Sequence, residues 1–266
     1  MSSERRERFR ALHADGIFVM PNAWDIGSAR LLASLGFQAL ATTSSGFAAT
    51  LGRPDGHTTF DELLEHAAAL AGAVDIPINV DSERMFADDL DGVAANVERI
   101  AETGAGGCSI EDWNPETGSI DPIEVAVERV AAAADAASRS GIVLTARAEN
   151  LIHGVDDLDD TIERLRRFRA AGADALFAPG LARADDIRRV VEATDAPLSV
   201  LHHRFAPSIP ELGQIGVRRI STGGALAFAA YGAAMSGARE LLESGTSQYA
   251  AGMLTTDDRV RAFGNR

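Results

Sequence analysis

Carboxylates and one arginine gather where apolar segments of this sequence end. Asp81 and Glu83 follow one such segment, Glu111 ends a second, and Arg147 and Glu149 follow a third. Several carboxylates brought together without lysines would repel one another, and one of them would have to take up a proton. A divalent cation removes that repulsion, and Mg²⁺ is usually held by one or two carboxylates, with water in its other positions. A single acidic strand end is more often a helix cap or a surface ion pair, but the set as a whole favours Mg²⁺.

Arg147 has two interpretations at the end of its segment. Its guanidinium can form a buried structural ion pair with Glu149, or it can grip the carboxylate or phosphonate of a substrate in bidentate fashion. Spacing alone leaves both open, and in the second interpretation Glu149 lies beside the bound substrate.

Hydroxyl and imidazole groups end other apolar segments. Thr43, Ser44 and Ser45 offer hydroxyls and backbone N–H groups to an oxyanion, or they form a simple turn. His202 and His203 end a later segment, where a histidine pair is more often partly exposed packing than a catalytic group. The sequence has no HEXXH or CXXC pattern, which disfavours a zinc site.

These residues belong to a regular alternation of short apolar runs and longer amphipathic ones. The predicted strands are 17–20, 38–43, 76–81, 106–111, 142–147, 173–178, 197–202 and 217–222. The predicted helices are 25–35, 60–74, 89–103, 122–139, 156–171, 184–193, 208–214 and 224–243. Eight β–α alternations with short links predict a (β/α)₈ TIM barrel, in which functional side chains lie at the C-terminal ends of the strands.

A doubly wound open sheet is the runner-up fold, but no G-x-G-x-x-G follows the first strand. No linker rich in Pro, Ser or Gly divides the chain, so we expect one domain over residues 1–266. It would begin with a short helix at about 2–15 and end with a helix and tail at about 224–266.

Individual residues mark helix starts and the core. Asp121 is expected to cap a helix with Pro122 in its first turn, and Thr59 to cap another with Glu62 three residues on. Cys108 lies inside a predicted strand and is expected in the core.

Composition excludes several kinds of partner. A formal net charge of −14 over 266 residues argues against nucleic-acid binding and disfavours anionic membranes, but it leaves room for a local pocket for a small anion. No stretch approaches the roughly 18 apolar residues of a membrane span. The N-terminus lacks the apolar core of a secretory signal, and a single cysteine fits a reducing compartment. We therefore expect a cytoplasmic enzyme.

Four stretches together resemble the isocitrate lyase/phosphoenolpyruvate mutase superfamily. They are "PNAWDIGSARLLASLGFQALATTSSGFAATLGRPDG", "NVDSE", "SIEDWN" and "TARAEN". The similarity runs from Pro21 to "STGGALAFAAYGA", which is most of the chain. The resemblance implies a (β/α)₈ barrel whose last helix is swapped between subunits of a homodimer or homotetramer. It also implies Mg²⁺ or Mn²⁺ and the cleavage or formation of a bond next to an α-oxo acid.

The resemblance carries roles onto the metal-binding residues by position. Asp81 matches the carboxylate that binds the metal directly, and this also places it against the substrate. Glu83 and Glu111 match residues that hold metal-bound waters. Arg147 matches the arginine that binds the substrate.

Positions around the substrate match as well. Thr43 and Ser44 match the pair that holds the pyruvyl carboxylate and oxygen. Trp24 lies where the family lines the pocket. Asp55, in "GRPDG", matches the aspartate near the reacting group, and we count it as a catalytic candidate.

This sequence also departs from the family. The loop after the fourth strand, "EDWNPETGSID", lacks the cysteine that isocitrate and methylisocitrate lyases use as general acid, so those two activities are not expected. The loop after the third strand reads "SERMFADDLDG" and lacks the family's usual stretch, so closure of the site would either differ from the family or rely on Arg84 and Phe86. The seventh strand ends in "LHHRF", where His202 or His203 would serve as proton donor or carboxylate ligand.

The favoured hypothesis is therefore a Mg²⁺-dependent lyase or mutase that forms an enolate from a small α-oxo acid. C–C cleavage, such as decarboxylation of an oxaloacetate-like acid, is favoured because it does not need the missing cysteine. A phosphonopyruvate or carboxyphosphonoenolpyruvate type of C–P mutase or hydrolase is the alternative. An aldolase that uses pyruvate and a barrel that only binds a metabolite are further alternatives.

Overall fold

The eight predicted strands form one parallel sheet in the computed structural model, which describes residues 2–264. The strands are β1 (Phe18–Val19), β2 (Leu40–Ala41), β3 (Ile78–Val80), β4 (Gly107–Glu111), β7 (Val143–Arg147), β8 (Ala175–Phe177), β9 (Leu198–Leu201) and β10 (Arg219–Ser221). Their order is β1-β10-β9-β8-β7-β4-β3-β2. A parallel bridge from Asn22, just after β1, to Ala41 of β2 joins the two ends of this order. The predicted TIM-barrel fold is confirmed.

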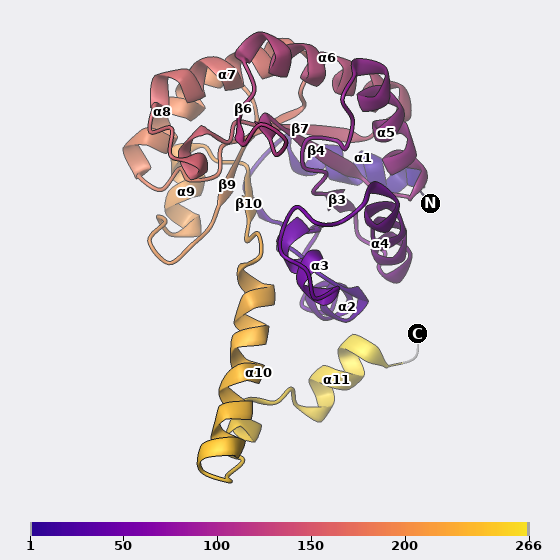
Figure 1. Cartoon of the computed structure of the whole chain (residues 1–266), viewed down its shortest axis with the longest axis vertical. Coiled ribbons are helices and arrows are strands. Elements are labelled where there is room, and N and C mark those ends of the chain that lie inside the picture. Colours follow the sequence, from indigo (N-terminus) through magenta and orange to yellow (C-terminus); the bar gives the residue numbers. More distant parts are fainter. Residues whose placement is uncertain (1, 265–266) are drawn as a thin grey trace.

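Helices surround the sheet (Figure 1). They are α1 (Ser2–Leu12), α2 (Ile26–Ser34), α3 (Ser44–Thr50), α4 (Phe60–Ala73), α5 (Leu90–Glu102), α6 (Ile123–Ser140), α7 (Leu158–Ala170), α8 (Ala184–Thr194), α9 (Ile209–Ile215), α10 (Ala225–Glu243) and α11 (Thr256–Phe263), with the 3₁₀ turns η1 (Asn150–His153) and η2 (Gln248–Gly252). A hairpin of β5 (Trp113–Asn114) and β6 (Ser119–Ile120) follows β4. Each helix predicted after a strand lies within about two residues of its expected range.

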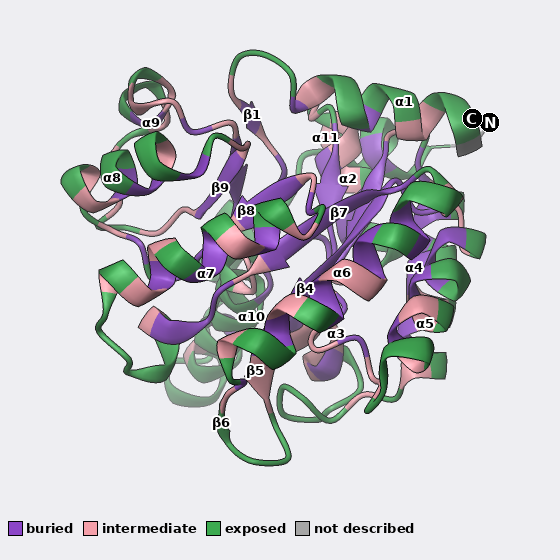
Figure 2. Cartoon of the chain, turned by 90° about the horizontal axis from the view of Figure 1, so that it is seen from above, coloured by how far each residue is buried: buried purple, intermediate pink, exposed green. Residues whose placement is uncertain are grey.

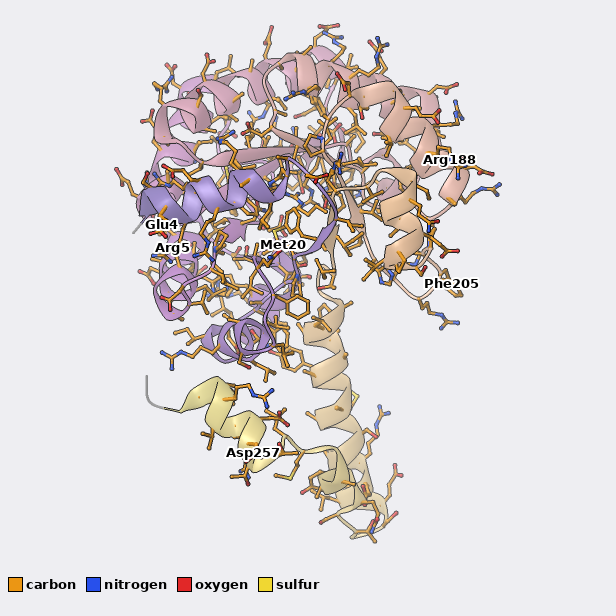
Figure 3. All side chains as sticks on the ribbon, turned by 180° about the vertical axis from the view of Figure 1, so that it is seen from behind. Glu4, Arg5, Met20, Arg188, Phe205 and Asp257 are labelled. Atoms are coloured by element: carbon orange, nitrogen blue, oxygen red, sulfur yellow. The ribbon has the colours of Figure 1, made fainter. Side chains whose placement is uncertain are left out.

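Burial follows the apolar runs of the predicted strands and the amphipathic pattern of the predicted helices. The strands are buried along nearly their whole length, whereas the helices bury one face and expose the other (Figure 2). Met20 lies inside the barrel at 1% exposure, whereas Phe205 points outward at 72% exposure (Figure 3). The core is therefore the space inside the sheet and the layer between sheet and helices.

Helix α1 packs against one end of the barrel. Its Phe9 is fully buried and clusters with Phe18 of β1 and Val143 of β7. Gly107 makes this approach possible, because a Cβ there would lie 2.8 Å from Phe9 Cε1 and 2.6 Å from the Val143 carbonyl oxygen. The predicted N-terminal helix exists and ends at Leu12 rather than near residue 15.

Helix α10 extends away from the barrel, and α11 returns toward α2 (Figure 1). Large apolar side chains of this segment are exposed, including Phe228 at 52%, Met235 at 56% and Leu242 at 87%. Residues 265 and 266 of the expected tail, like residue 1 of the expected domain, lie outside the described residues.

The two predicted caps have different outcomes. Thr59 Oγ1 accepts from the Glu62 N–H at 3.3 Å and Glu62 Oε2 accepts from the Thr59 N–H at 2.8 Å, which confirms the capping box. The Asp121 cap is wrong, because Pro122 is the N-cap residue of α6 and makes no side-chain cap bond. Asp121 instead accepts from Arg84 Nε at 2.8 Å, a buried ion pair that takes the place of the cap.

In residues 2–264, no helix is both long enough and apolar enough to cross a lipid bilayer.

Candidate active site

Arg147 lies at the C-terminal end of β7 and pairs with three carboxylates. Its Nη1 lies 2.6 Å from Asp81 Oδ1, its Nη2 lies 3.2 Å from Glu111 Oε2, and its Nε lies 2.8 Å from Glu149 Oε1. Burial lowers the pKa of Arg147, but the charges of Glu149, Glu111 and Asp81 outweigh it and hold that pKa well above its usual value. The guanidinium is therefore a permanent cation at the centre of an acidic cluster.

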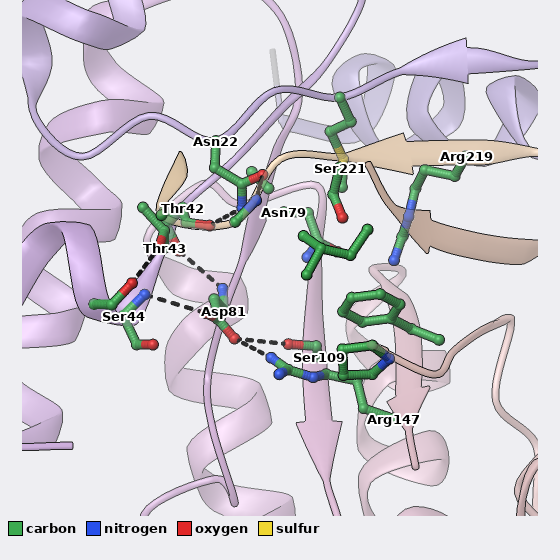
Figure 4. A pocket seen from close by; sticks show the side chains of 18 of the residues that line it. Asn22, Thr42, Thr43, Ser44, Asn79, Asp81, Ser109, Arg147, Arg219 and Ser221 are labelled. Atoms are coloured by element: carbon green, nitrogen blue, oxygen red, sulfur yellow. Dashed lines mark hydrogen bonds and ion pairs between the residues drawn. The ribbon is translucent and has the colours of Figure 1, made fainter. Parts of the chain in front are cut away.

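Asp81 is held from several sides at the end of β3. Its backbone N–H donates to Thr42 Oγ1 at 2.8 Å, and its Oδ2 accepts from the Ser44 N–H at 3.1 Å (Figure 4). Ser109 Oγ donates to Asp81 Oδ1 at 3.5 Å. The TTSSG segment, for which a turn or an oxyanion site was predicted, thus begins α3, with Thr43 as its N-cap residue, and donates a backbone N–H to Asp81.

Glu83 is the carboxylate whose charge has the least compensation. Its Oε1 is buried and has no hydrogen-bond partner among residues 2–264. Burial and the charges of Asp81 and Asp55 raise the pKa of Glu83 to about 7. Its backbone has φ of +48°, in the left-handed region that non-glycine residues rarely adopt, and such strain is often found at functional sites.

The pKa of Glu111 is raised as well. Burial and the charges of Glu149, Asp81 and Glu83 raise its pKa well above the usual value, against the opposing effect of Arg147. Four carboxylates and one guanidinium therefore make up the cluster, in which the acidic groups outnumber the basic one.

The donor set fits a hard cation that keeps water ligands. In the described part of the chain, no three His, Cys, Asp or Glu side chains form a ready-made set of direct metal ligands. One direct carboxylate with further carboxylates bound through water is a common arrangement for Mg²⁺. The unpartnered oxygen of Glu83 and the excess of acidic groups are the features that such a cation would satisfy.

Two adjoining hollows hold the cluster. An inner cavity of about 170 Å³ and an outer one of about 400 Å³ share Ser44, Asp55, Arg147 and Ile152 in their linings. Of the predicted site residues, Thr43, Ser44, Ser45, Asp55, Asp81 and Arg147 line the inner cavity, and Glu83, Glu111 and Glu149 line the outer one. The structure thus brings these nine residues together.

Two predicted site residues lie elsewhere. Trp24 is in neither lining, and its Cβ packs close to Gly46 of α3. His202 is also in neither lining; its backbone N–H donates to the Ser221 carbonyl, and its side chain is half-buried. His203 Nδ1 accepts from the Phe205 N–H at 3.2 Å.

Sequence reasoning missed other residues of these linings. His57, Trp113 and His153 line the outer cavity, and the rings of Trp113 and His153 stack with centroids 3.5 Å apart. Arg219, Asn79 and Ser221 line the inner one. The sequence contained one clue to these, since Arg218 and Arg219 are adjacent on a predicted strand and one of them must point inward.

The loops after β3 and β4 are fixed by buried contacts. Arg129 donates to the carbonyl oxygens of Arg84 and Ala87 at 2.7 Å, and Phe86 packs on Phe60 with ring centroids 5.6 Å apart. Arg84 pairs with Asp121 and Phe86 packs on Phe60, so neither side chain is free to move over the site and close it.

Asp112 is a supporting residue behind the cluster. It is 2% exposed, accepts from the Glu149 N–H at 2.8 Å and pairs with Arg164 at 3.1 Å. Burial raises the pKa of Asp112 to about 6. This carboxylate orients Glu149, so at this position the structural interpretation of an acidic strand end holds.

The sequence and the fold match known proteins. A family described as "Phosphoenolpyruvate phosphomutase" matches residues 9–242. A solved structure from Burkholderia cenocepacia J2315, titled as a putative lyase/mutase, is 44% identical with a TM-score of 0.95 and covers 99% of this chain and 97% of that one.

Two curated relatives carry activity names. A probable 2-methylisocitrate lyase 2 of Corynebacterium glutamicum is 33% identical over 74% of this chain and 66% of its own length. An oxaloacetate decarboxylase of Bradyrhizobium sp. is 29% identical over 81% of this chain and 76% of its own length.

Proposed function

Because the chain belongs to the phosphoenolpyruvate phosphomutase family of lyases and mutases, we propose that it forms an enolate from a small α-oxo acid with the help of Mg²⁺ or Mn²⁺. The observation that carries the proposal is the acidic cluster of Asp81, Glu83, Glu111 and Glu149 around Arg147. Such a cluster, buried at the strand ends of a barrel, is costly without a counter-ion, and catalytic groups of barrel enzymes lie at this end.

The metal would be held by Asp81 directly and by Glu83 and Glu111 through water. When bound, it would act as a Lewis acid toward the oxygen on which negative charge develops. It would also compensate the negative charge of Glu83 and Glu111, whose pKa values are raised by burial and by neighbouring carboxylates.

The residues of the chain have separate tasks in C–C cleavage. Arg147 is placed to donate hydrogen bonds to the substrate oxygens, because it lines both cavities. As the C–C bond breaks, its electron pair passes to the α-oxo unit, and the resulting enolate oxygen gains charge near Arg147. An interaction that strengthens as charge develops lowers the barrier more than it stabilises the bound substrate.

A proton must then reach the enolate carbon. Asp55 faces both cavities, and His57 and His153 line the outer one, so all three are candidates for this donor. His202, which with His203 was offered by the sequence as a proton donor or carboxylate ligand, lies outside both linings. We propose that the donor comes from the outer cavity.

The C–P alternative uses the same cluster. Asp55 lines both cavities, and in phosphonopyruvate hydrolysis or phosphoryl migration it would activate water or guide the moving group. A barrel that only binds a metabolite would have no need of the strained Glu83 or of four clustered carboxylates.

We also propose that α10 packs against a second copy of the chain in a homodimer or homotetramer, because its apolar side chains are exposed.

Assays with oxaloacetate and phosphonopyruvate, run side by side with Mg²⁺, test the proposal. We expect pyruvate from oxaloacetate above the metal-only background, with a several-hundredfold loss in Arg147→Ala, roughly the effect of removing one such electrostatic group. Phosphate release would move the assignment to C–P chemistry. Turnover of neither substrate, with a melting temperature that Mg²⁺ raises equally in wild type and Asp81→Ala, would contradict the proposal.

A further inference from the structure

Arg219 is a second arginine inside the barrel, and the mechanism above does not use it. It lies at the start of β10, is 3% exposed and lines the inner cavity. Among residues 2–264, no carboxylate forms an ion pair with it, whereas Arg147 has three such partners. A buried, unpaired cation is costly, so its presence calls for an explanation.

Neutral acceptors hold the Arg219 guanidinium in place. Nη1 donates to Thr145 Oγ1 at 2.9 Å and Nε to Ser199 Oγ at 3.1 Å. Both hydroxyl residues are buried, and neither carries charge. These contacts fix the orientation of the guanidinium and leave its charge uncompensated.

His13 of α1 completes this support. Its Nδ1 lies 2.8 Å from the Phe9 carbonyl oxygen, which can only accept, so Nδ1 carries the hydrogen. Its Nε2 then accepts from Arg219 Nη1 at 3.3 Å. Burial and the nearby Arg219 charge lower the pKa of His13 to about 3, so the imidazole is neutral.

Arg219 lies one layer deeper in the barrel than Arg147. Thr145, its hydrogen-bond partner, is two residues before Arg147 on β7, and the two side chains share the inner face about 7 Å apart along the strand. Both arginines line the same inner cavity and point into it from different strands (Figure 4). Burial and the charge of Arg147 lower the pKa of Arg219 to about 9, so it remains a cation at neutral pH.

Further polar groups line this deep end. Ser221 follows Arg219 by two residues on the same face of β10 and also lines the cavity. Asn79 is 4% exposed, and its Oδ1 has no hydrogen-bond partner among the described residues. An amide oxygen only accepts, so this atom calls for a hydrogen-bond donor such as water and not for a carboxylate.

We propose that Arg219, with Ser221, forms a second anion subsite that binds the distal carboxylate of a dicarboxylic substrate. This rests on the proposed function, in which the first anionic end of the substrate lies at Arg147 and the metal. The inner cavity of about 170 Å³ is close to the roughly 150 Å³ cavity that holds benzene in another protein, which limits the substrate to a small diacid.

The subsite also bears on which C–C bond is cleaved. An arginine binds a carboxylate more strongly than it binds neutral CO₂, so pairing with a carboxylate that leaves would stabilise the substrate more than the transition state. The carboxylate at Arg219 is therefore one that the reaction retains. Retro-aldol-type cleavage of a diacid meets this condition. Oxaloacetate would lose this carboxylate, so its decarboxylation, the reaction in the assay above, should be slower than retro-aldol-type cleavage of a diacid that keeps it.

Binding of matched ligands tests the subsite. Malate and 2-hydroxybutanoate have the same chain length and differ only in the distal carboxylate, and calorimetry with Mg²⁺ gives the Kd of each. We expect wild type to prefer malate by at least about tenfold, the scale of one charge-assisted hydrogen bond, and Arg219→Gln to lose that preference. Arg219→Lys should retain part of it.

Arg218→Gln is the matched control, because Arg218 is the neighbouring residue, contacts the Gly16 carbonyl at the surface and changes the net charge equally. It should keep the malate preference. Ser221→Asp supplies a counter-charge beside Arg219 and should abolish the preference, which gives a second result should Arg219→Gln not fold. An unchanged malate preference in folded Arg219→Gln or Ser221→Asp overturns the subsite.

Oxalate separates this inference from the proposed function, because it can occupy only the end near the metal. Its Mg²⁺-dependent binding should be the same in wild type and Arg219→Gln. Failure of oxalate to bind wild type, together with a malate preference that depends on Arg219, would overturn the proposed function and leave the subsite. Normal oxalate binding without a malate preference would overturn the subsite and leave the proposed function.

Discussion

At the scale of single residues, the charged groups of the site differ in where they lie along their strands. Asp81, Glu83, Glu111 and Arg147 lie where an apolar strand ends, at the edge that holds the two cavities. Arg219 lies before the end of its predicted strand, where the sequence shows only that Arg218 or Arg219 must point inward.

His13, which supports Arg219, gives a prediction about pH. Its pKa is about 3 in the folded protein against 6.5 in the unfolded chain, so the unfolded state binds the extra proton. Its contribution to stability is complete above pH 6.5 and falls as the pH drops toward 3, by up to about 1.4 kcal/mol per pH unit. The free energy of unfolding of His13→Asn, measured by urea denaturation, should fall less steeply over this range than that of wild type. Parallel curves for the two proteins would show that His13 is not buried in its neutral form.

At the scale of elements, hydrophobic periodicity was sufficient for the strands and the helices between them. It could not predict α3 or the β5–β6 hairpin, because short elements bury too little apolar surface to leave a period. The cap predicted at Asp121 was wrong for a tertiary reason: Arg84, distant in sequence, pairs with that carboxylate. The capping box at Thr59 was predictable because all its partners lie within three residues.

The contact between α1 and β4 leads to a prediction about stability. In Gly107→Ala the new methyl group would lie 2.6 Å from the Val143 carbonyl oxygen and 2.8 Å from Phe9, so α1 or β7 must shift. We expect a loss of about 1–3 kcal/mol in the free energy of unfolding. Gly72→Ala on α4 is the control, because its methyl group meets nothing within 4 Å, and a gain of about 0.5–1 kcal/mol is expected there. Equal effects of the two changes would rule out the close packing of α1.

At the scale of the whole molecule, the alternation of strands and helices predicted the barrel, but the sequence alone did not show that α10 leaves it (Figure 1). Leaving the barrel exposes Phe228, Tyr231, Met235 and Leu242, a larger set of apolar side chains than a free surface usually carries. A second copy of the chain would bury them. The swapped arrangement implied by the family resemblance therefore stays a prediction with a physical reason.

Sedimentation velocity tests this assembly. We expect wild type to sediment as a dimer or a tetramer, and Met235→Glu to shift it toward monomer, because a charge would be buried in the interface. Val125→Glu on α6 is the control, since Val125 is also exposed, at 40%, but lies away from α10. A wild-type protein that is monomeric at micromolar concentration would contradict the predicted assembly.

The proposed function requires that the acidic cluster with its metal forms an enolate. Exchange of the pyruvate methyl protons with deuterated water, followed by NMR in the presence of Mg²⁺, tests this claim without knowledge of the true substrate. We expect exchange that is faster than with Mg²⁺ alone, lost on chelation and lost in Asp81→Ala and Arg147→Ala. Exchange no faster than with the metal alone, in a folded protein, would contradict it.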